Sequence, residues 1–260
     1  MKHFNNTSAD TEFFERTAIC FSGELRTFKV AMPRILDYFR DTPADIYCHT
    51  WTTSGDHLHK KQDFDLLEEM IDNSVHNFLD MEYQTSINHA GPFGNMLYSI
   101  QKANFNKCKV EVRNNFRYDK VIKCRYDMLV PSGKTFGDRQ VEDRSIYYSI
   151  GNRGLVPNDF GKHGLSDIIF WGDSPSMDIA CDTYRYYNWE TFPLALKLQG
   201  GYTIDPGDSM LSPGTLIYQQ ALKRNIKMVQ IVPQLMETLW RTSVEDLDPD
   251  TQLNEIRAAY

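Results

Sequence analysis

Short apolar runs alternate with amphipathic stretches along most of this 260-residue chain. Residues 17–22 and 44–49 form two such runs, each with the length and composition of a buried strand. Between them, residues 30–40 carry Ile35, Leu36 and Phe39 at helical spacing. Strands that alternate with helices favour an α/β fold with a mostly parallel central sheet flanked by helices.

The same pattern extends through the rest of the chain and predicts one α/β domain over residues 17–242. A flexible N-terminus (1–16) would precede it and an acidic C-terminal segment (243–260) would follow. The glycine-rich residues 131–164 divide the domain into a first half (17–130) and a second half (131–242). The pattern predicts further helices over 64–71, 96–116, 176–187 and 208–224, and further strands over 75–81, 118–130, 145–150, 167–171 and 227–232.

Composition excludes several partners. With 28 Lys and Arg against 35 Asp and Glu, the chain is acidic and has no basic run, which argues against nucleic acid or an anionic membrane surface as a partner. No stretch approaches the roughly 20 apolar residues of a membrane span, and the N-terminus is too polar for a signal peptide. Five scattered cysteines without a C-x-x-C pair indicate free thiols and a cytoplasmic protein.

The first strand ends in Ser22 and Gly23, followed by Arg26 and Thr27. Ligands of open parallel sheets bind beyond the carboxyl ends of the strands. Gly23 permits close approach of a ligand to the backbone, and the guanidinium of Arg26 can grip a diphosphate. The alternative is an ordinary strand-to-helix turn with a solvated arginine.

The second strand ends near His49 and Trp51, where an indole ring could stack on a nucleobase. A histidine and a tryptophan beside an apolar run are also common core residues. Both interpretations are open at this stage.

Residues 118–130 end an apolar run in Arg125-x-Asp127. Side chains two apart in a strand point to the same face, so a cation and a carboxylate would be presented together. Asp127 could hold a divalent cation and Arg125 could neutralise phosphates. The alternative is an exposed ion pair at a strand end, worth about 0–1 kcal/mol.

Asp167 and Asp208 are the other acidic candidates. Asp167 opens the strand 167–171, and Asp208 precedes a helix and could serve as a general base or only as a helix cap. The D-x-D spacing of Asp63 and Asp65 matches a metal motif, but it follows no strand, and both acids suit a helix N-terminus.

Taken in order, four segments resemble GT-A-type glycosyltransferase-like proteins of bacterial polysaccharide loci and of large viruses and phages. The segments are SGELRT (22–27), HTW (49–51), YDKVIKCRYD (118–127) and a later Asp-x-x-x-x-Gly strand (167–172). The sequence departs from the family at Arg125, which precedes Asp127 in place of the first acid of a D-x-D motif. It departs also at Glu24, where such sequences often have glutamine.

The resemblance implies a GT-A-like, Rossmann-type sandwich that transfers a sugar from a nucleotide-diphospho-sugar to a hydroxyl of an acceptor glycan. The implied donor-binding residues are Ser22, Gly23, Arg26, Thr27, His49, Trp51, Arg125 and Asp127, with Mn²⁺ or Mg²⁺ on Asp127, and the implied catalytic acids are Asp208 and Asp167. The alternative is a non-catalytic nucleotide- or glycan-binding protein of the same fold.

Overall fold

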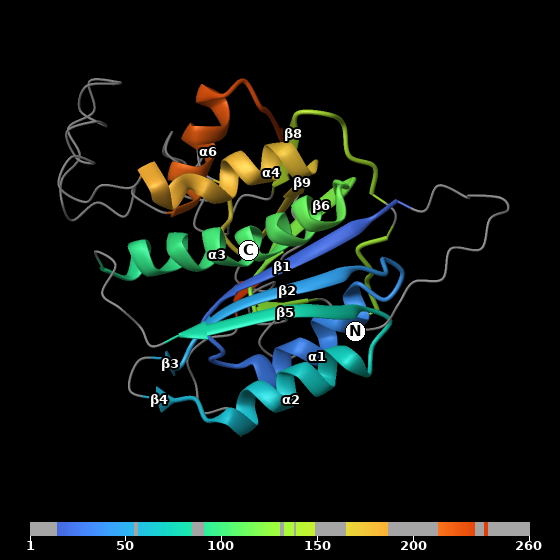
Figure 1. Cartoon of the computed structure of the whole chain (residues 1–260), viewed down its shortest axis with the longest axis vertical. Coiled ribbons are helices and arrows are strands. Elements are labelled where there is room, and N and C mark those ends of the chain that lie inside the picture. The colour runs from blue at the N-terminus through green and yellow to red at the C-terminus, as the bar shows by residue number, and fades with distance from the viewer. Residues whose placement is uncertain are drawn as a thin grey trace, which may run out of the picture.

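The structure is a computed structural model that describes residues 15–54, 57–84, 91–130, 133–137, 139–148, 165–186, 213–231 and 237–238. Its centre is a seven-stranded sheet in the order β10-β8-β9-β6-β1-β2-β5 (Figure 1). The strands β6, β1, β2 and β5 run parallel to one another, and β8 runs parallel to β10. Strand β9 is antiparallel to both of its neighbours. The expected α/β fold with a mostly parallel sheet is confirmed.

The elements follow the predicted order closely. The strands are β1 (Thr17–Gly23), β2 (Asp45–Trp51), β3 (Thr53–Ser54), β4 (His57–Leu58), β5 (Asn77–Gln84), β6 (Lys120–Cys124), β7 (Met128–Leu129), β8 (Ser145–Tyr148), β9 (Ile169–Gly172), β10 (Lys227–Gln230) and β11 (Glu237–Thr238). The helices are α1 (Phe28–Tyr38), α2 (Lys61–Asp72), α3 (Gly91–Asn114), α4 (Ser174–Cys181), the 3₁₀ helix η3 (Asp182–Tyr186) and α6 (Pro213–Lys223).

One predicted strand differs from the structure. Residues 118–130 were expected to form a single strand, but β6 ends at Cys124, a turn follows, and β7 pairs with β11 in a separate two-stranded sheet. Arg125 and Asp127 therefore lie in a turn, so the strand argument for their common face does not apply. The turn forms because Tyr126 points inward and is fully buried.

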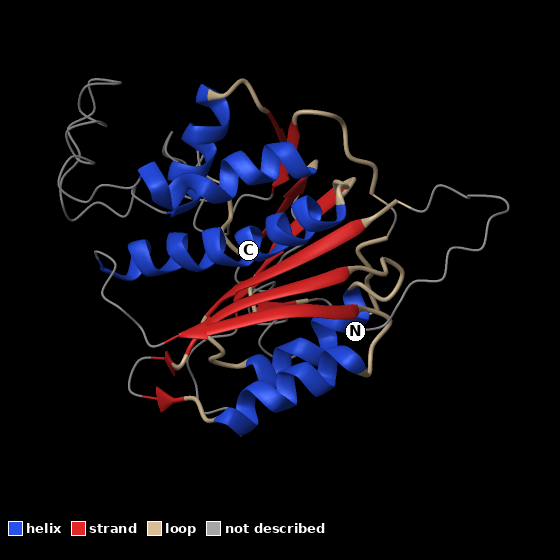
Figure 2. Cartoon of the chain, viewed as in Figure 1, coloured by secondary structure: helices blue, strands red, loops and turns tan. Residues whose placement is uncertain are grey.

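Helices cover both faces of the sheet (Figure 2). Helices α1 and α2 pack on one face through a cluster that includes Met32, Ile35 and Leu67. Helices α3, α4 and α6 pack on the other face, where Leu97 and Ile217 belong to a second cluster. The central strand β1 is buried from Thr17 to Ser22, as expected for a strand covered on both faces.

The chain order creates a switch point in the sheet. After β1 the chain moves outward through β2 to β5, and α3 then returns it to β6 on the opposite side of β1. In open α/β sheets, ligands bind outside the carboxyl ends of the strands at the point where the order reverses. That point lies here between β1 and β6.

Several expectations fall on residues outside the described ranges: the N-terminus up to residue 14, residues 149–164 of the glycine-rich segment 131–164, Asp208, and the whole segment 243–260. Within the described part of the chain, no helix combines the length and the apolar character that crossing a membrane requires. All five cysteines are free, as expected, and all but Cys108 are buried.

Candidate active site

The carboxyl ends of β1, β2 and β6 bring together most of the residues singled out by the sequence. In register, Ser22 lies opposite His49, and Phe21 lies opposite Cys124, the residue before Arg125. Strand β9 begins at the same edge, since Ile169 lies opposite Cys124. This sheet-edge site therefore contains Ser22, Gly23, Arg26, Thr27, His49, Trp51, Arg125, Asp127 and Asp167, whereas Asp208 lies outside the described residues.

Gly23 gives the site an open stretch of backbone. Its φ of +122° lies in the region that favours glycine, and among the described residues no atom lies within 4 Å of where a Cβ would stand. A ligand can therefore approach the chain closely here, as the sequence predicted. A larger residue at position 23 would be disfavoured by the backbone conformation and not by a lack of space.

The β1–α1 turn places the start of a helix beside Gly23. Helix α1 begins after Thr27, whose side chain makes no capping hydrogen bond, and its first turn contains no acidic residue. An uncapped helix N-terminus carries partial positive charge and suits a phosphate. Arg26 adds a cation, although its Nε donates to Glu24 Oε2 at 2.7 Å, so Glu24 offsets part of that charge.

Ser99 of α3 joins the ends of β1 and β2, and sequence reasoning missed it. The Gly23 N–H donates to Ser99 Oγ at 2.9 Å, and His49 Nδ1 lies 2.9 Å from the same oxygen. Ser99 Oγ also lies 3.3 Å from the carbonyl oxygen of His49, to which it donates. A small polar residue between Leu97 and Ile100 on the buried face of a helix is the signal that could have identified it.

His49 and Trp51 lie in an aromatic cluster with Tyr98. The ring of Trp51 stacks on Tyr98 at 5.7 Å, and the ring of His49 meets that of Trp51 edge-on at 5.1 Å. Trp51 is only 3% exposed. This packing agrees with the core alternative for both residues, and stacking of Trp51 on a base would require Tyr98 to move.

Arg125 is held by two carboxylates. Its Nε and Nη2 donate to Asp127 Oδ1 and Oδ2, both at 2.8 Å, and its Nη1 donates to Asp167 Oδ2 at 2.9 Å. All three guanidinium nitrogens are thus engaged. The ion pair that the sequence left as an alternative does form, but Asp127 is only 2% exposed, so it is not an exposed pair.

Tyr126 fixes the turn that carries this pair. Its hydroxyl donates to the carbonyl oxygens of Phe21 and His49, at 3.3 Å in each case, and its ring stacks on Phe21 at 5.5 Å. These contacts tie the turn to the ends of β1 and β2. The turn that carries Arg125 is therefore fixed against the ends of β1 and β2.

Asp167 is the accessible acid of the site, because its side chain is 27% exposed. Burial alone would raise its pKa, but the charges of Arg125 and Lys123 outweigh that effect and hold the pKa of Asp167 below its ordinary value. The carboxylate is consequently ionised near neutral pH. Such a group accepts hydrogen bonds from sugar hydroxyls well and takes up a proton poorly.

The surroundings of Asp127 do not fit a divalent cation. Both of its oxygens already accept hydrogen bonds from Arg125, and the guanidinium lies between Asp127 and Asp167, where a bridging cation would have to bind. A cation there would meet the positive charge of Arg125 directly. Arg125 therefore takes the place of a metal ion between these two acids.

A second group of metal-ligand atoms lies between α3 and α4. Ligand atoms of Cys108, Glu111 and Asp178 lie within 4.8 Å of one another, which makes this cluster a possible metal site by composition. However, Lys107 Nζ lies 2.7 Å from Asp178 Oδ1 and 3.0 Å from Glu111 Oε2. Burial also raises the pKa of the Cys108 thiol to about 12, so the thiolate ligand is disfavoured. Lys107 is the cation of this cluster.

Lys123 lies directly beneath Asp167. Its Nζ donates to the backbone carbonyl oxygen of Asp167, and the residue is 1% exposed. Burial lowers its pKa from an ordinary value of 10.5 to about 8. The pKa of Lys123 is thus lower in the folded protein than in the unfolded chain. Burial of the neutral amine costs no stability above pH 10.5, and this favourable situation is lost as the pH falls toward 8 and the amine takes up a proton.

We therefore expect Lys123→Met to raise the free energy of unfolding at pH 7 by about 2 kcal/mol. The gain relative to wild type should shrink steadily as the pH is raised toward 10.5. Urea unfolding of both proteins across this pH range measures the difference. If the gain does not change with pH, the pKa of Lys123 is the same in the folded protein and in the unfolded chain, and the expectation is wrong.

Comparison with known proteins gives a limited result. No protein-family model and no curated protein matches the chain. Among solved structures, the chain is similar to the apo form of the glycosyltransferase GlyE from Streptococcus pneumoniae TIGR4. The identity is 12% and the TM-score 0.43, over 83% of this chain and 45% of GlyE. The chain thus spans less than half of the GlyE chain that it matches.

Proposed function

We propose that the sheet-edge site binds a nucleotide-diphospho-sugar and that the protein transfers the sugar to a hydroxyl group of an acceptor glycan. The observation that carries the proposal is the arrangement at the switch point. There the open backbone at Gly23, the start of α1 and Arg26 adjoin the Arg125–Asp167 pair. The five buried or partly buried free thiols suit the reducing cytoplasm as the place of action.

The donor's diphosphate would lie over the β1–α1 turn. The partial positive charge at the start of α1 and the guanidinium of Arg26 can stabilise the negative charge that the diphosphate gains as the bond to the sugar breaks. Three of the five N–H groups of Arg125 bind Asp127 and Asp167, which leaves two that could reach a phosphate. Its role in this proposal is to position Asp167.

Asp167 would hold the sugar. Its exposed carboxylate can accept hydrogen bonds from the hydroxyls of the transferred sugar and place the anomeric carbon. In the transfer step the acceptor oxygen bonds to that carbon, the bond to the diphosphate breaks, and the acceptor's proton passes to a base. Asp208 is proposed as that base on sequence grounds alone.

Incubation with a panel of nucleotide sugars tests the proposal. We expect one or more donors to raise the melting temperature and to be hydrolysed slowly to the nucleoside diphosphate. Asp167→Asn should lower hydrolysis and transfer by about 100-fold or more while nucleoside-diphosphate affinity stays close to that of wild type, since Asp167 is assigned to the sugar. Arg26→Gln should instead weaken nucleoside-diphosphate affinity.

Chelation provides the control for the role of Arg125. Because the guanidinium lies between the two acids, EDTA should leave turnover unchanged and Mn²⁺ should not be required. Donor binding without release of nucleoside diphosphate would favour the non-catalytic alternative. If no nucleotide or nucleotide sugar in the panel binds, the proposal is wrong.

A further inference from the structure

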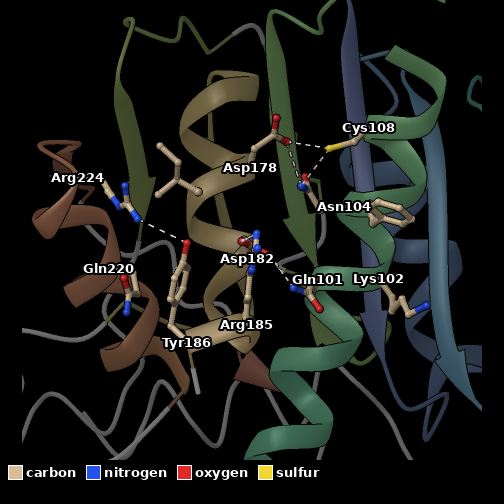
Figure 3. A pocket seen from close by; sticks show the side chains of 12 residues that line it. Gln101, Lys102, Asn104, Cys108, Asp178, Asp182, Arg185, Tyr186, Gln220 and Arg224 are labelled. Atoms are coloured by element: carbon tan, nitrogen blue, oxygen red, sulfur yellow. Dashed lines mark hydrogen bonds and ion pairs between the residues drawn. The ribbon is translucent and has the colours of Figure 1, made fainter. Parts of the chain in front are cut away.

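A pocket of about 640 Å³ opens between α3, α4, η3 and α6, the helices on the face of the sheet opposite α1 and α2 (Figure 3). Gln101 and Phe105 of α3, Asp182 and Tyr186 of η3 and Gln220 of α6 are among the residues that line it. Its volume is in the range of pockets that hold small molecules. The sheet-edge site does not include any of these residues.

Two aromatic side chains of this helical pocket are half-exposed, and each has one polar contact. Lys109 Nζ lies 5.4 Å from the centre of the Phe105 ring, and the Tyr186 hydroxyl accepts from Arg224 Nη2 at 3.5 Å. Phe105 is 54% exposed and Tyr186 is 50% exposed, and they approach the pocket from different elements. Aromatic faces bind the apolar C–H face of a sugar ring, because both surfaces are flat and the ring face is electron-rich. Half-exposed rings beside amide and carboxylate side chains therefore favour a saccharide.

The polar groups of the pocket match sugar hydroxyls. Gln101 Nε2 donates to Asp182 Oδ1 at 2.6 Å, which orders an amide and a carboxylate side by side, and Gln220 adds another amide. An amide can donate to one hydroxyl and accept from another, and a carboxylate accepts from hydroxyls. A sugar with neighbouring hydroxyl groups presents the complementary pattern.

Charges around the pocket favour a neutral ligand. Lys102 Nζ lies 3.2 Å from Glu82 Oε1, and Arg185 Nη1 lies 3.9 Å from Asp182 Oδ2. Asp178, at the far end, contacts Lys107 and Arg117. Arg224 also lines the pocket, so the lining holds three cations and two carboxylates. The surplus is one exposed arginine, which is less than the cluster of cations that binds a phosphate group.

The end of the pocket at Lys102 lies near the carboxyl edge of the sheet, where the sheet-edge site is. Lys102 lies over the ring of Tyr98 at 5.4 Å, and its partner Glu82 lies opposite His49 in the sheet. From there the pocket follows α3 toward Cys108. A glycan bound along this path would have one end near the carboxyl edge of the sheet.

We propose that the helical pocket binds a neutral saccharide and anchors the acceptor glycan. Only the role as an anchor rests on the proposed transferase function; saccharide binding itself is independent of it. The residues that determine binding are Phe105 and Tyr186 through stacking, and Gln101, Asp182 and Gln220 through hydrogen bonds.

Titration with neutral saccharides tests this inference. The probes are maltotriose, cellotriose, triacetylchitotriose and the methyl glycosides of glucose, galactose and mannose, followed by ¹H–¹⁵N spectra and calorimetry. We expect at least one probe to shift amide signals of residues 101–108 and 182–186. Phe105→Ala and Tyr186→Ala should each weaken its affinity roughly tenfold, because each removes one stacking contact.

Val112→Ala is the matched control, since Val112 lies on the same helix, is 78% exposed and does not line the pocket. Its affinity for the saccharide should equal that of wild type. The inference is overturned if no probe binds, if Tyr186→Ala binds as wild type does, or if inorganic phosphate binds in place of the saccharides. Affinity for the nucleoside diphosphate of whichever donor binds in the nucleotide-sugar panel, measured on the same variants, reports on the donor site separately and should be unchanged.

Discussion

Asp127→Asn is expected to lower the free energy of unfolding at pH 7 by about 3 kcal/mol. Asp127 is 2% exposed, and both of its oxygens bind Arg125. Asparagine places a neutral amide group against the guanidinium of Arg125, which then has one carboxylate partner in place of two. Removal of one partner of a buried ion pair costs about 3–5 kcal/mol, and Asp167, which still pairs with Arg125, keeps the loss at the lower end. Urea unfolding followed by circular dichroism measures the loss.

Asp167→Asn is the matched control, because it changes the same chemical group on the same arginine. Its side chain is 27% exposed, so it should cost no more than about 1 kcal/mol. The two acids thereby separate stability from function: Asp127 mainly holds the turn, and Asp167 faces the ligand. Equal losses in the two variants would contradict this division.

A double-mutant cycle isolates the pair itself. Arg125→Gln alone leaves Asp127 buried without its cation, whereas Arg125→Gln combined with Asp127→Asn leaves two neutral amides. We expect the double variant to be more stable than the sum of the single losses predicts, with a coupling energy of about 1–3 kcal/mol. The coupling confirms that the contacts seen in the turn account for the loss.

The fold could largely be predicted from the sequence because its signals are local. Apolar runs such as 17–22 and amphipathic helices such as 30–40 are recognised from spacing alone, and β1 and α1 agree with them to within about two residues. The run 118–130 was misread because apolar residues continue through Tyr126. Its turn depends on hydrogen bonds to Phe21 and His49, which are distant in sequence.

The place of the candidate residues at the edge of the sheet could be predicted, but their interactions could not. The carboxyl ends of parallel strands had to meet, so Gly23 and Arg125 were placed at one edge correctly. The sequence could not show that Arg125 also binds Asp167, which is 42 residues away, because that contact depends on the antiparallel direction of β9. Ser99 was missed for the same reason, since its partners lie on other elements.

Lys107→Met is expected to cost about 3–5 kcal/mol at pH 7, the second large effect. Lys107 is fully buried, and its Nζ lies within 3.0 Å of Ser174 Oγ, Asp178 Oδ1 and Glu111 Oε2. Methionine fills a similar volume but leaves Glu111, which is 1% exposed, without its buried cation. Arg117 still contacts both acids from the surface, although its own side chain is 56% exposed and compensates only in part.

The pH dependence of this loss identifies its cause. Burial would raise the pKa of Asp178, but Lys107 outweighs that effect and holds the pKa below 3.8. The stability that Asp178 contributes is therefore present above pH 3.8 and is lost as the pH falls through the lowered value. Consequently, the difference between wild type and Lys107→Met should be largest near neutral pH and shrink toward pH 3, as protonated carboxyl groups no longer need a cation.

Two further variants make this test decisive. Lys109→Met changes the same residue type on the same helix, but Lys109 is half-exposed and lies 3.9 Å from Asp80, so its effect should stay within about 0.5 kcal/mol. Combining Lys107→Met with Glu111→Gln removes the uncompensated charge and should recover about 1–3 kcal/mol of the loss. If the double variant is no more stable than Lys107→Met, packing rather than charge accounts for the effect, and Lys107 does not act as the cation of the cluster.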